Sequence, residues 1–447
     1  MGKTTVATGL VAALRHAGHR PATAKVGPDF IDPGYHALAS GRPPRNLDAW
    51  MCGPEALAPL AARAGAGADV LVVEGVMGMF DGANDGTPTS TAEVAKALGA
   101  PVVLVVDAGA MSGSVAALVS GFARFDPALD VAGVILNRVG SDGHEVLLRD
   151  ALAPLGLPVL GALRRDDRLT WRDRHLGLVP VAERPAAVAE ALDHLAAAVA
   201  ERVDLEAVAR LAAGAPPTPA GPVVLPPPVV PAGRRVAVAV AAGAAFTFTY
   251  ADTLDALAAA GVDVLPFDPA RDPALPEGVA GLIAGGGFPE VHAADLSANA
   301  PLLADVRARV DAGLPTWAEC GGLLWLCRTL DGRPMVGAVP ADGRMTDRLT
   351  LGYRTATAVH AAPAVAAGAT LRGHEFHYST VEPGGDALRL SSRWGARSDG
   401  FATPSILATY LHVHPGGDPT PVTRFARACA AHAATRGAGR ARRRTDA

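Results

Sequence analysis

The chain has 447 residues, a formal net charge of −4 and a composition that is 49% hydrophobic. It is too long for one ordinary domain, and its weak net charge argues against a nucleic-acid surface. Its four cysteines lack metal-type spacing. This cysteine usage suits a reducing cytoplasm and argues against a disulfide framework. No apolar run approaches the roughly 20 residues that span a bilayer, and no signal-type segment precedes residue 2. These features predict a cytoplasmic protein with neither a membrane nor a nucleic-acid partner.

The first residues predict part of a phosphate-binding loop. Gly2, Lys3, Thr4 and Thr5 precede apolar residues at helical spacing, as in the second half of a P-loop. Lys3 would reach the β- and γ-phosphates of ATP, and Thr4 would hold Mg²⁺ at the helix N-terminus. The strand and glycine that normally precede such residues are missing, so we expect that Met1 is not the natural start. Taken alone, the four residues are also compatible with a chance match.

Charged residues follow two predicted strands of the first half. A short strand ends in a loop with Lys25, Asp29 and Asp32, which could organise Mg²⁺ or could be an ordinary solvated turn. Four apolar residues at 70–73 run directly into Glu74, as in a buried parallel strand. A carboxylate at that strand end occupies the Walker-B position, where it would hold Mg²⁺. The predicted metal ligands are Thr4, Glu74 and Asp29.

Strands and helices continue to alternate through the first half. Strands are predicted at 101–107, 131–139 and 158–163, with helices at about 112–123 and 144–155. This alternation indicates an α/β domain with a doubly wound, mainly parallel sheet.

A proline-dense stretch then divides the chain. Many prolines and few charges favour a stiff, extended linker at 214–233. The sequence therefore predicts one domain at 1–213 and a second at 234–435. An arginine-rich end at 436–447 is predicted as a disordered tail.

The second domain also has an α/β pattern, with one cysteine at a predicted sharp turn. Strands are predicted at 235–240, 262–267 and 279–284, and a helix at 252–260. Cys320 lies between a predicted strand and a predicted helix, where the helix N-terminus would favour a thiolate. The backbone N–H groups of Gly287 and Gly321 could form an oxyanion hole. His412 follows an apolar strand that is distant in the sequence, and it could act as the general base for Cys320. The alternative is a buried structural cysteine.

A segment at 372–379 carries two histidines around a glutamate. His374, Glu375 and His377 could suggest a metal site. The alternation of His374, Phe376 and Tyr378 also fits a half-buried strand, which we favour.

At this point the second half resembles the class I glutamine amidotransferases. Its Ala-Glu-Cys-Gly-Gly and Tyr-Leu-His-x-His segments are similar to the cobyrinic-acid-type branch of that family. The resemblance implies that Cys320 is the nucleophile toward L-glutamine and that His412 is its base. Many class I relatives have a glutamate two residues after the histidine, where this chain has His414. The third member of the triad is therefore either absent or supplied by another residue.

The first half resembles the ATP domain of cobyrinate and hydrogenobyrinate a,c-diamide synthases, which have a dethiobiotin-synthetase-like P-loop fold. The similar segments are Lys-Val-Gly-Pro-Asp-Phe-Ile-Asp-Pro-Gly-Tyr-His, Arg-Asn-Leu-Asp-x-Trp-Met and Glu-Gly-Val-Met-Gly-Met-Phe-Asp-Gly. The resemblance implies that Lys25 and Asn137 bind the nucleotide. It also implies substrate-binding roles for the residues Asp29, Asp32, Tyr35 and Asp81.

Together these resemblances imply a two-site ligase. Ammonia released from L-glutamine would amidate the a- and c-carboxylates of a corrinoid, each activated by ATP and Mg²⁺ as an acyl phosphate. A cobyric acid synthase-like amidase is the nearest alternative, and a partition-type P-loop ATPase is a more distant one. Whether the substrate contains cobalt, the order of amidation and the oligomeric state stay open, and a homodimer is compatible with the sequence.

Overall fold

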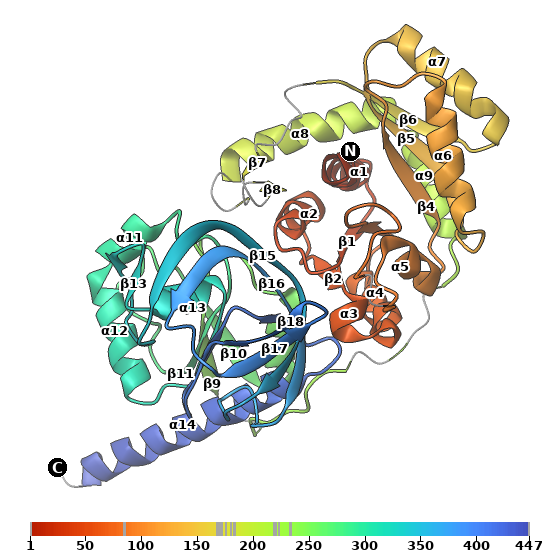
Figure 1. The fold of residues 1–447 in the computed structure, drawn as a ribbon. Coiled ribbons are helices and arrows are strands. Elements are labelled where there is room, and N and C mark those ends of the chain that lie inside the picture. Colours follow the sequence, from red (N-terminus) through yellow and green to blue (C-terminus); the bar gives the residue numbers. More distant parts are fainter. Residues whose placement is uncertain are drawn as a thin grey trace. The chain divides into compact units, whose positions relative to one another are not determined.

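The computed structural model describes residues 2–83, 86–166, 173–174, 177–178, 181, 185–217, 221, 224–231 and 235–445. The chain forms two compact units, Met1–Val223 and Val224–Ala447 (Figure 1). The division between them falls inside the proline-dense segment for which the sequence predicts a linker.

The first unit alternates strands with helices. Its strands are β1 (Pro21–Val26), β2 (Arg45–Leu47), β3 (Val70–Glu74), β4 (Val102–Asp107), β5 (Val131–Val139), β6 (Val159–Arg164), β7 (Asp173–Arg174) and β8 (Gly177–Leu178). Its helices are α1 (Lys3–His16), α2 (Asp32–Ser40), α3 (Ala49–Cys52), α4 (Leu57–Ala64), α5 (Thr91–Leu98), α6 (Ser114–Phe125), α7 (Asp142–Leu152), α8 (Pro185–Arg202) and α9 (Leu205–Gly214), with short 3₁₀ turns at Pro54–Ala56 and Ala153–Leu155.

The larger strands of this unit form two parallel sheets, in the orders β2-β1-β3 and β4-β5-β6. The α/β class with parallel sheets is thus confirmed, but the described strands divide into two sheets rather than one. Within the first sheet, Lys25 of β1 lies opposite Glu74 of β3. The carboxyl ends of these strands therefore present their charged residues side by side.

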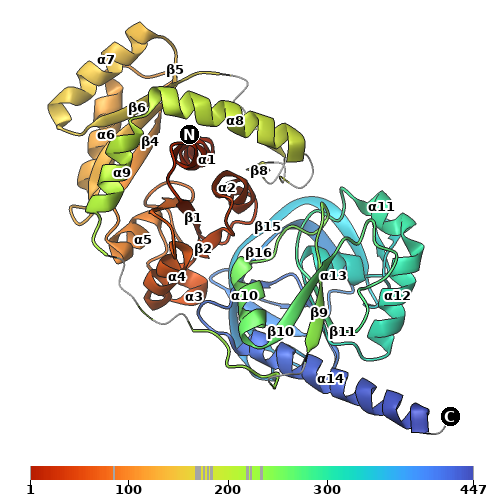
Figure 2. The ribbon, with the colours of Figure 1, turned by 180° about the vertical axis from the view of Figure 1, so that it is seen from behind.

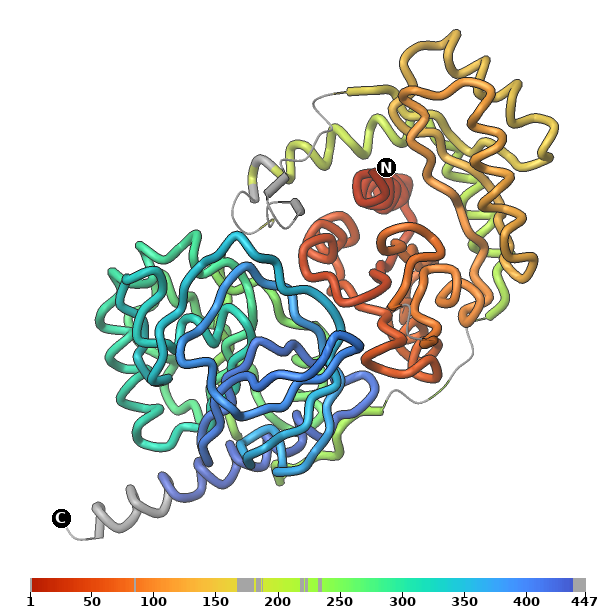
Figure 3. Tube along the Cα trace, in the orientation of Figure 1, coloured from red at the N-terminus to blue at the C-terminus, as the bar shows by residue number. Residues whose placement is uncertain are grey.

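The helix α1 joins the two sheets through side-chain packing. Leu10 of this helix belongs to the same core as Val70 of β3, Ile135 of β5 and Leu195 of α8. On β5 the neighbouring Leu136 faces a separate core shared with α6 and α7, as the alternation of side chains along a strand requires. Figure 3 traces α8 beside α1. Buried apolar contacts therefore position the start of α1 over the strand ends.

The second unit contains a larger number of strands. They are β9 (Val236–Ala241), β10 (Val262–Phe267), β11 (Val279–Ala284), β12 (Thr316–Glu319), β13 (Thr329–Leu330), β14 (Arg333–Pro334), β15 (Asp342–Ala358), β16 (Thr370–Glu382), β17 (Leu388–Ser392), β18 (Gly395–Asp399), β19 (Phe401–Ala402), β20 (Ile406–Thr409) and β21 (His412–Val413). Its helices are α10 (Ala251–Ala259), α11 (Ala293–Ala298), α12 (Ala300–Asp311), α13 (Gly321–Leu326) and α14 (Thr420–Thr445).

A six-stranded sheet in the order β10-β9-β11-β12-β20-β19 forms the centre of this unit. Alternate residues of β9 face opposite cores: Ala239 packs in the core that includes α11, α12 and α13. Val238 and Val240 pack in the core that includes α10 and α14. Figure 2 shows α10 and α14 from behind. Helices thus cover both faces of the sheet, and β12 is buried in its interior.

A second, mainly antiparallel sheet is built on the long β15–β16 pair, and β21 joins its edge. Helix α14 continues to Thr445, through residues where a disordered tail was expected. Alanine and arginine dominate that segment, and both favour helix. Within the part of the chain that the structure describes, no helix is long and apolar enough to cross a bilayer.

Candidate functional sites in the two units

Cys320 lies at the sharp turn between β12 and α13. It precedes the first helical residue and has φ 49° and ψ −101°, a backbone conformation that costs a non-glycine residue about 1–3 kcal/mol. A hydrogen bond from its backbone N–H to the Thr409 carbonyl, 2.8 Å long, anchors the turn to β20. The surrounding strands therefore hold a strained residue at the end of a buried strand.

Glycines allow this turn to pack closely against the loop after β11. A side chain at Gly322 would collide with the Ala284 carbonyl, and a Cβ at Gly321 would lie 3.0 Å from the Gly287 nitrogen. A Cβ at Gly286 would lie 2.6 Å from Cε1 of His412. The structure thus brings Gly287 and Gly321, the predicted oxyanion-hole residues, into direct proximity beside the histidine.

His412 begins the short strand β21, opposite His374 of β16. Its ring makes a side-chain hydrogen bond with Cys320, and Nδ1 lies 3.4 Å from a carboxylate oxygen of Glu319. Burial opposes a charged ring, but Cys320 and Glu319 outweigh it and raise the pKa of His412 to about 10. The predicted thiol and base are therefore in contact, in surroundings that favour an imidazolium.

His414, which occupies the position of the usual triad glutamate, belongs to a different cluster. Its Nε2 lies 3.5 Å from a carboxylate oxygen of Asp252, and its Nδ1 accepts a 3.0 Å hydrogen bond from the Gly416 N–H. Its ring also packs edge-on against Tyr250. These contacts connect His414 to α10 and to the segment before α14.

The histidine–glutamate segment of β16 forms a buried polar network. Glu375 pairs with Arg354 at 2.7 Å and with Arg397, while the His377 ring stacks on Tyr410 with centroids 3.7 Å apart. Burial keeps His374 neutral by lowering its pKa well below the usual value. Two arginines thus pair with the Glu375 carboxylate, which the sequence suggested as a possible metal ligand.

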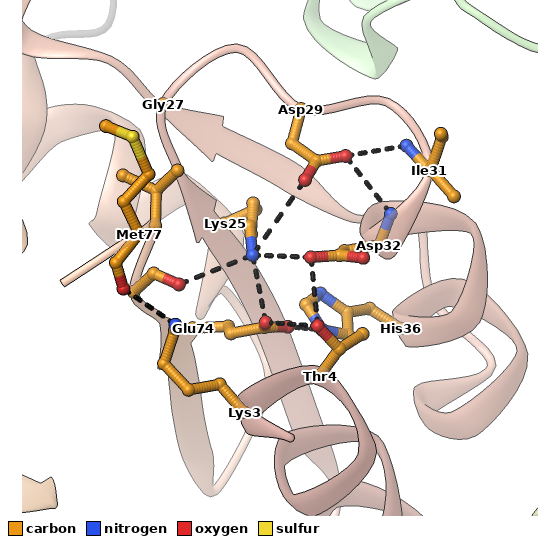
Figure 4. Close-up of polar contacts among 12 residues, drawn as sticks. Lys3, Thr4, Lys25, Gly27, Asp29, Ile31, Asp32, His36, Glu74 and Met77 are labelled. Carbon is orange, nitrogen blue, oxygen red and sulfur yellow. Dashed lines mark hydrogen bonds and ion pairs between the residues drawn. The ribbon is translucent and has the colours of Figure 1, made fainter. Parts of the chain in front are cut away.

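In the first unit, a cluster of charged side chains lies at the strand ends beneath the start of α1 (Figure 4). The Thr4 hydroxyl donates to Glu74 at 2.8 Å and lies 3.1 Å from Asp32. Lys25 contacts the same two carboxylates, at 2.6 Å from Asp32 and 2.9 Å from Glu74. His36 donates to the other Glu74 oxygen at 2.6 Å. Side chains of α1, β1 and α2 therefore converge on the Glu74 carboxylate of β3.

The ionisation of this cluster follows from its burial and pairing. Burial opposes the charge of Glu74, yet the hydrogen bond from His36 and the Lys25 ammonium lower its pKa to about 2. Burial and the neighbouring Asp29 and Glu74 raise the pKa of Asp32 to about 7. Glu74 is therefore an anion at neutral pH, which suits a cation ligand.

The donors around Lys25 fit a magnesium ion. A cationic group already stands among the oxygens of Thr4, Asp32 and Glu74, and Mg²⁺ prefers such hard oxygen ligands. Asp29, the predicted ligand, lies 3.9 Å from Lys25. Its carboxylate instead accepts from the backbone N–H groups of residues 31 and 32 at the start of α2. The structure therefore brings Asp32, rather than Asp29, to Thr4 and Glu74.

Other predicted residues of the first unit have contacts outside this cluster. Lys3 donates to the Met77 carbonyl at 2.7 Å, and Gly2 lies so close to Asn137 that a Cβ would collide with its amide. Asp81 accepts from the Gly78 N–H and so closes its own loop. Thr5 lies on the first turn of α1, and Tyr35 is buried, with 2% of its surface exposed. The structure thus brings Gly2 to Asn137 and Lys3 to the Met77 carbonyl.

Sequence reasoning missed two residues of these sites. His36 follows Asp32 by four residues on α2, and side chains at that spacing share a helix face. Glu319 immediately precedes Cys320 and ends β12. The helical spacing could have revealed the first, and a carboxylate beside the nucleophile could have revealed the second.

Comparison with known proteins assigns a class to each unit. Residues 237–420 match the CobB/CobQ-like glutamine amidotransferase domain, and residues 1–179 match the CobQ/CobB/MinD/ParA nucleotide binding domain. The chain thus combines a nucleotide-binding domain with a glutamine amidotransferase domain, as its sequence predicts.

Curated relatives match nearly the whole chain. Hydrogenobyrinate a,c-diamide synthase of Streptomyces coelicolor is 50% identical, over 96% of this chain and 95% of that protein. The same-named protein of Thermobifida fusca is 48% identical over 96% of this chain and 94% of its own. Cobyrinate a,c-diamide synthase of Synechococcus is 40% identical over 96% of both chains. The chain belongs to the family of hydrogenobyrinate and cobyrinate a,c-diamide synthases.

Proposed function

We propose that this chain uses ATP and L-glutamine to amidate the a- and c-carboxylates of hydrogenobyrinate or cobyrinate, a reaction of cobalamin biosynthesis. The near-full-length identity of 50% to a named hydrogenobyrinate a,c-diamide synthase carries this proposal. With this activity, the chain is an amidating ligase with two sites. The relatives described above are a,c-diamide synthases, which favours this activity over that of a cobyric acid synthase.

At the second-unit site, Cys320 attacks the side-chain amide of glutamine. His412 takes the thiol proton and gives it to the departing ammonia, and water then hydrolyses the thioester to glutamate. The N–H groups of Gly287 and Gly321 would stabilise the oxyanion, a contribution of about 3–4 kcal/mol for one such donor. The contact of Cys320 with His412 supports these roles.

At the first-unit site, Thr4, Asp32 and Glu74 would hold Mg²⁺, which would neutralise charge on the phosphates of ATP. Lys3 and the N-terminus of α1 would bind the phosphates. Lys25, freed from its carboxylate partners, would stabilise the negative charge on the transferred phosphoryl group. Phosphorylation of the corrinoid carboxylate supplies a good leaving group, which ammonia then displaces.

Four variants test the assignment. Cys320→Ala should abolish glutamine-driven synthesis and preserve ammonia-driven synthesis. Glu74→Gln should impair both, since it removes a charge at the ATP site. Cys327→Ala is the matched thiol control, because burial raises the pKa of that thiol to about 12. His412→Ala should lower glutaminase activity about a hundredfold or more. Full glutamine-driven turnover by Cys320→Ala would contradict the proposal.

A further inference from the structure

The carboxylate beside the nucleophile is positioned to act on the catalytic base. Glu319 is the last residue of β12 and pairs with Thr409 of β20. The chain then turns into β21, so His412 returns to the end of β12. One Glu319 oxygen lies 3.4 Å from His412 Nδ1, and the other lies 3.4 Å from the Val413 N–H. Both oxygens thus face β21.

The site otherwise lacks the expected third residue in its usual place. His414 stands two residues after His412, and its described contacts are with Asp252, Gly416 and Tyr250. Its Nδ1 already accepts from the Gly416 N–H, and its Nε2 lies beside Asp252, so His414 supplies no carboxylate to His412. A carboxylate that orients the His412 ring must therefore come from another position.

We propose that Glu319 is the third member of the glutaminase triad, a positioning residue that acts through His412. This inference rests on the proposed roles of Cys320 and His412. The carboxylate would accept Nδ1–H, which leaves Nε2 unprotonated for the thiol. The thiol proton moves to Nε2 and then to the departing ammonia, while Glu319 keeps its negative charge throughout.

The charges around His412 agree with this role. Cys320 at the start of α13 and Glu319 on β12 both favour the charged ring. His374 faces it from β16, with ring centroids 5.5 Å apart, and is kept neutral by burial. Glu319 therefore raises the pKa of His412, and its loss should lower that pKa.

The test compares Glu319→Gln and Glu319→Asp with Asp252→Asn, which removes the carboxylate beside His414. Glutaminase kcat should fall about 10²- to 10⁴-fold in Glu319→Gln, and ammonia-driven synthesis should be unchanged. The alkaline limb of the kcat/KM profile should move to lower pH by about one unit or more. Glu319→Asp keeps the charge, so it should restore the limb and part of the rate, whereas Asp252→Asn should not move the limb.

Each contrary result has a distinct meaning. A wild-type rate and pH limb in Glu319→Gln would overturn the inference. A limb that moves in Asp252→Asn instead would transfer the role to the His414 cluster. If Glu319→Gln does not fold, Glu319→Asp decides: because aspartate keeps the charge, an alkaline limb that moves to lower pH by about one unit or more in that variant would overturn the inference. Unchanged glutaminase activity in Cys320→Ala and His412→Ala would instead contradict the proposed function itself.

Discussion

At the scale of single residues, both sites depend on a buried histidine that contacts a carboxylate. In the first unit His36 holds one oxygen of Glu74, while Thr4 and Lys25 contact the other. A carboxylate fixed in this way presents a defined oxygen to a metal. Partners of metal ligands typically contribute 10- to 100-fold in affinity or activity, so His36 should matter although it would not touch the metal.

His36→Phe should therefore raise the Mg²⁺ concentration for half-maximal ammonia-driven synthesis by about 10- to 100-fold. His36→Gln can still donate to Glu74 and should show a smaller change. The matched control is His16→Phe, at an exposed position on α1. A Mg²⁺ titration of the ammonia-driven reaction makes the measurement, and equal curves for His36→Phe and His16→Phe would contradict the role.

Site residues that directly follow a buried strand could be predicted from the sequence. Pairings between side chains of different elements could not. Glu74 ends an apolar run, and Cys320 stands between two recognisable elements, so position alone indicated their roles. The sequence predicted Asp29 as a metal ligand, but its carboxylate accepts from the backbone at the start of α2, and Asp32 reaches Thr4 and Glu74 instead. The sequence alone does not show which of the two carboxylates makes the backbone contacts. The partnership of Glu319 with His412 depends on β20 and β21 folding back beside β12, which is a long-range contact.

At the scale of elements, close packing places α14 on the central sheet. Phe425 is fully buried and packs edge-on against Trp317 of β12, with ring centroids 5.8 Å apart. A Cβ at Gly281 of β11 would lie 3.2 Å from Phe425 and would collide with the Cys429 sulfur. The absence of a side chain at Gly281 is therefore what allows the helix to approach the strand.

Gly281→Ala should destabilise the second unit by about 1–3 kcal/mol through overpacking. Cys429→Ala removes the sulfur that the new methyl group would meet, so the double variant should lose less than the two single variants combined. Urea unfolding followed by Trp fluorescence gives the three free energies. If the losses in free energy of unfolding of the two single variants simply add in the double variant, α14 accommodates the methyl group at Gly281 without strain.

Element prediction worked best where a pattern was long and regular. The predicted strands near 131–139 and 279–284 match β5 and β11, because continuous apolar runs are typical of buried parallel strands. Before the linker the chain forms two helices, α8 and α9, and Asp204 caps the second one by accepting from the Ala207 N–H. The division of the first unit into two sheets depends on strand pairing, which local patterns do not encode.

At the scale of the whole molecule, the chain joins two chemistries that require each other. The second unit would release ammonia, and the first would make the electrophile that ammonia attacks. In bulk water at neutral pH ammonia is mostly ammonium, which is not a nucleophile. The proposed reaction is therefore efficient only if ammonia passes between sites of one molecule without release.

A mixing experiment tests this requirement. Cys320→Ala retains the ATP site, and Glu74→Gln retains the thiol site, so each should fail alone with glutamine. An equimolar mixture at neutral pH should also fail, since ammonia released by one molecule is diluted and protonated before it reaches the other. Added ammonia should restore synthesis by Cys320→Ala and serves as the control. Recovery of about half the wild-type rate in the mixture would show that ammonia is exchanged freely.

The backbone conformation of Cys320 also has an evolutionary consequence. Glycine tolerates a positive φ that strains any other residue, so Cys320→Gly should be a more stable protein that lacks the thiol. A lineage that obtained its nitrogen from free ammonia would gain stability by losing this cysteine, and mutational drift would favour that loss. Persistence of the cysteine in a genome is therefore a record of continued dependence on glutamine.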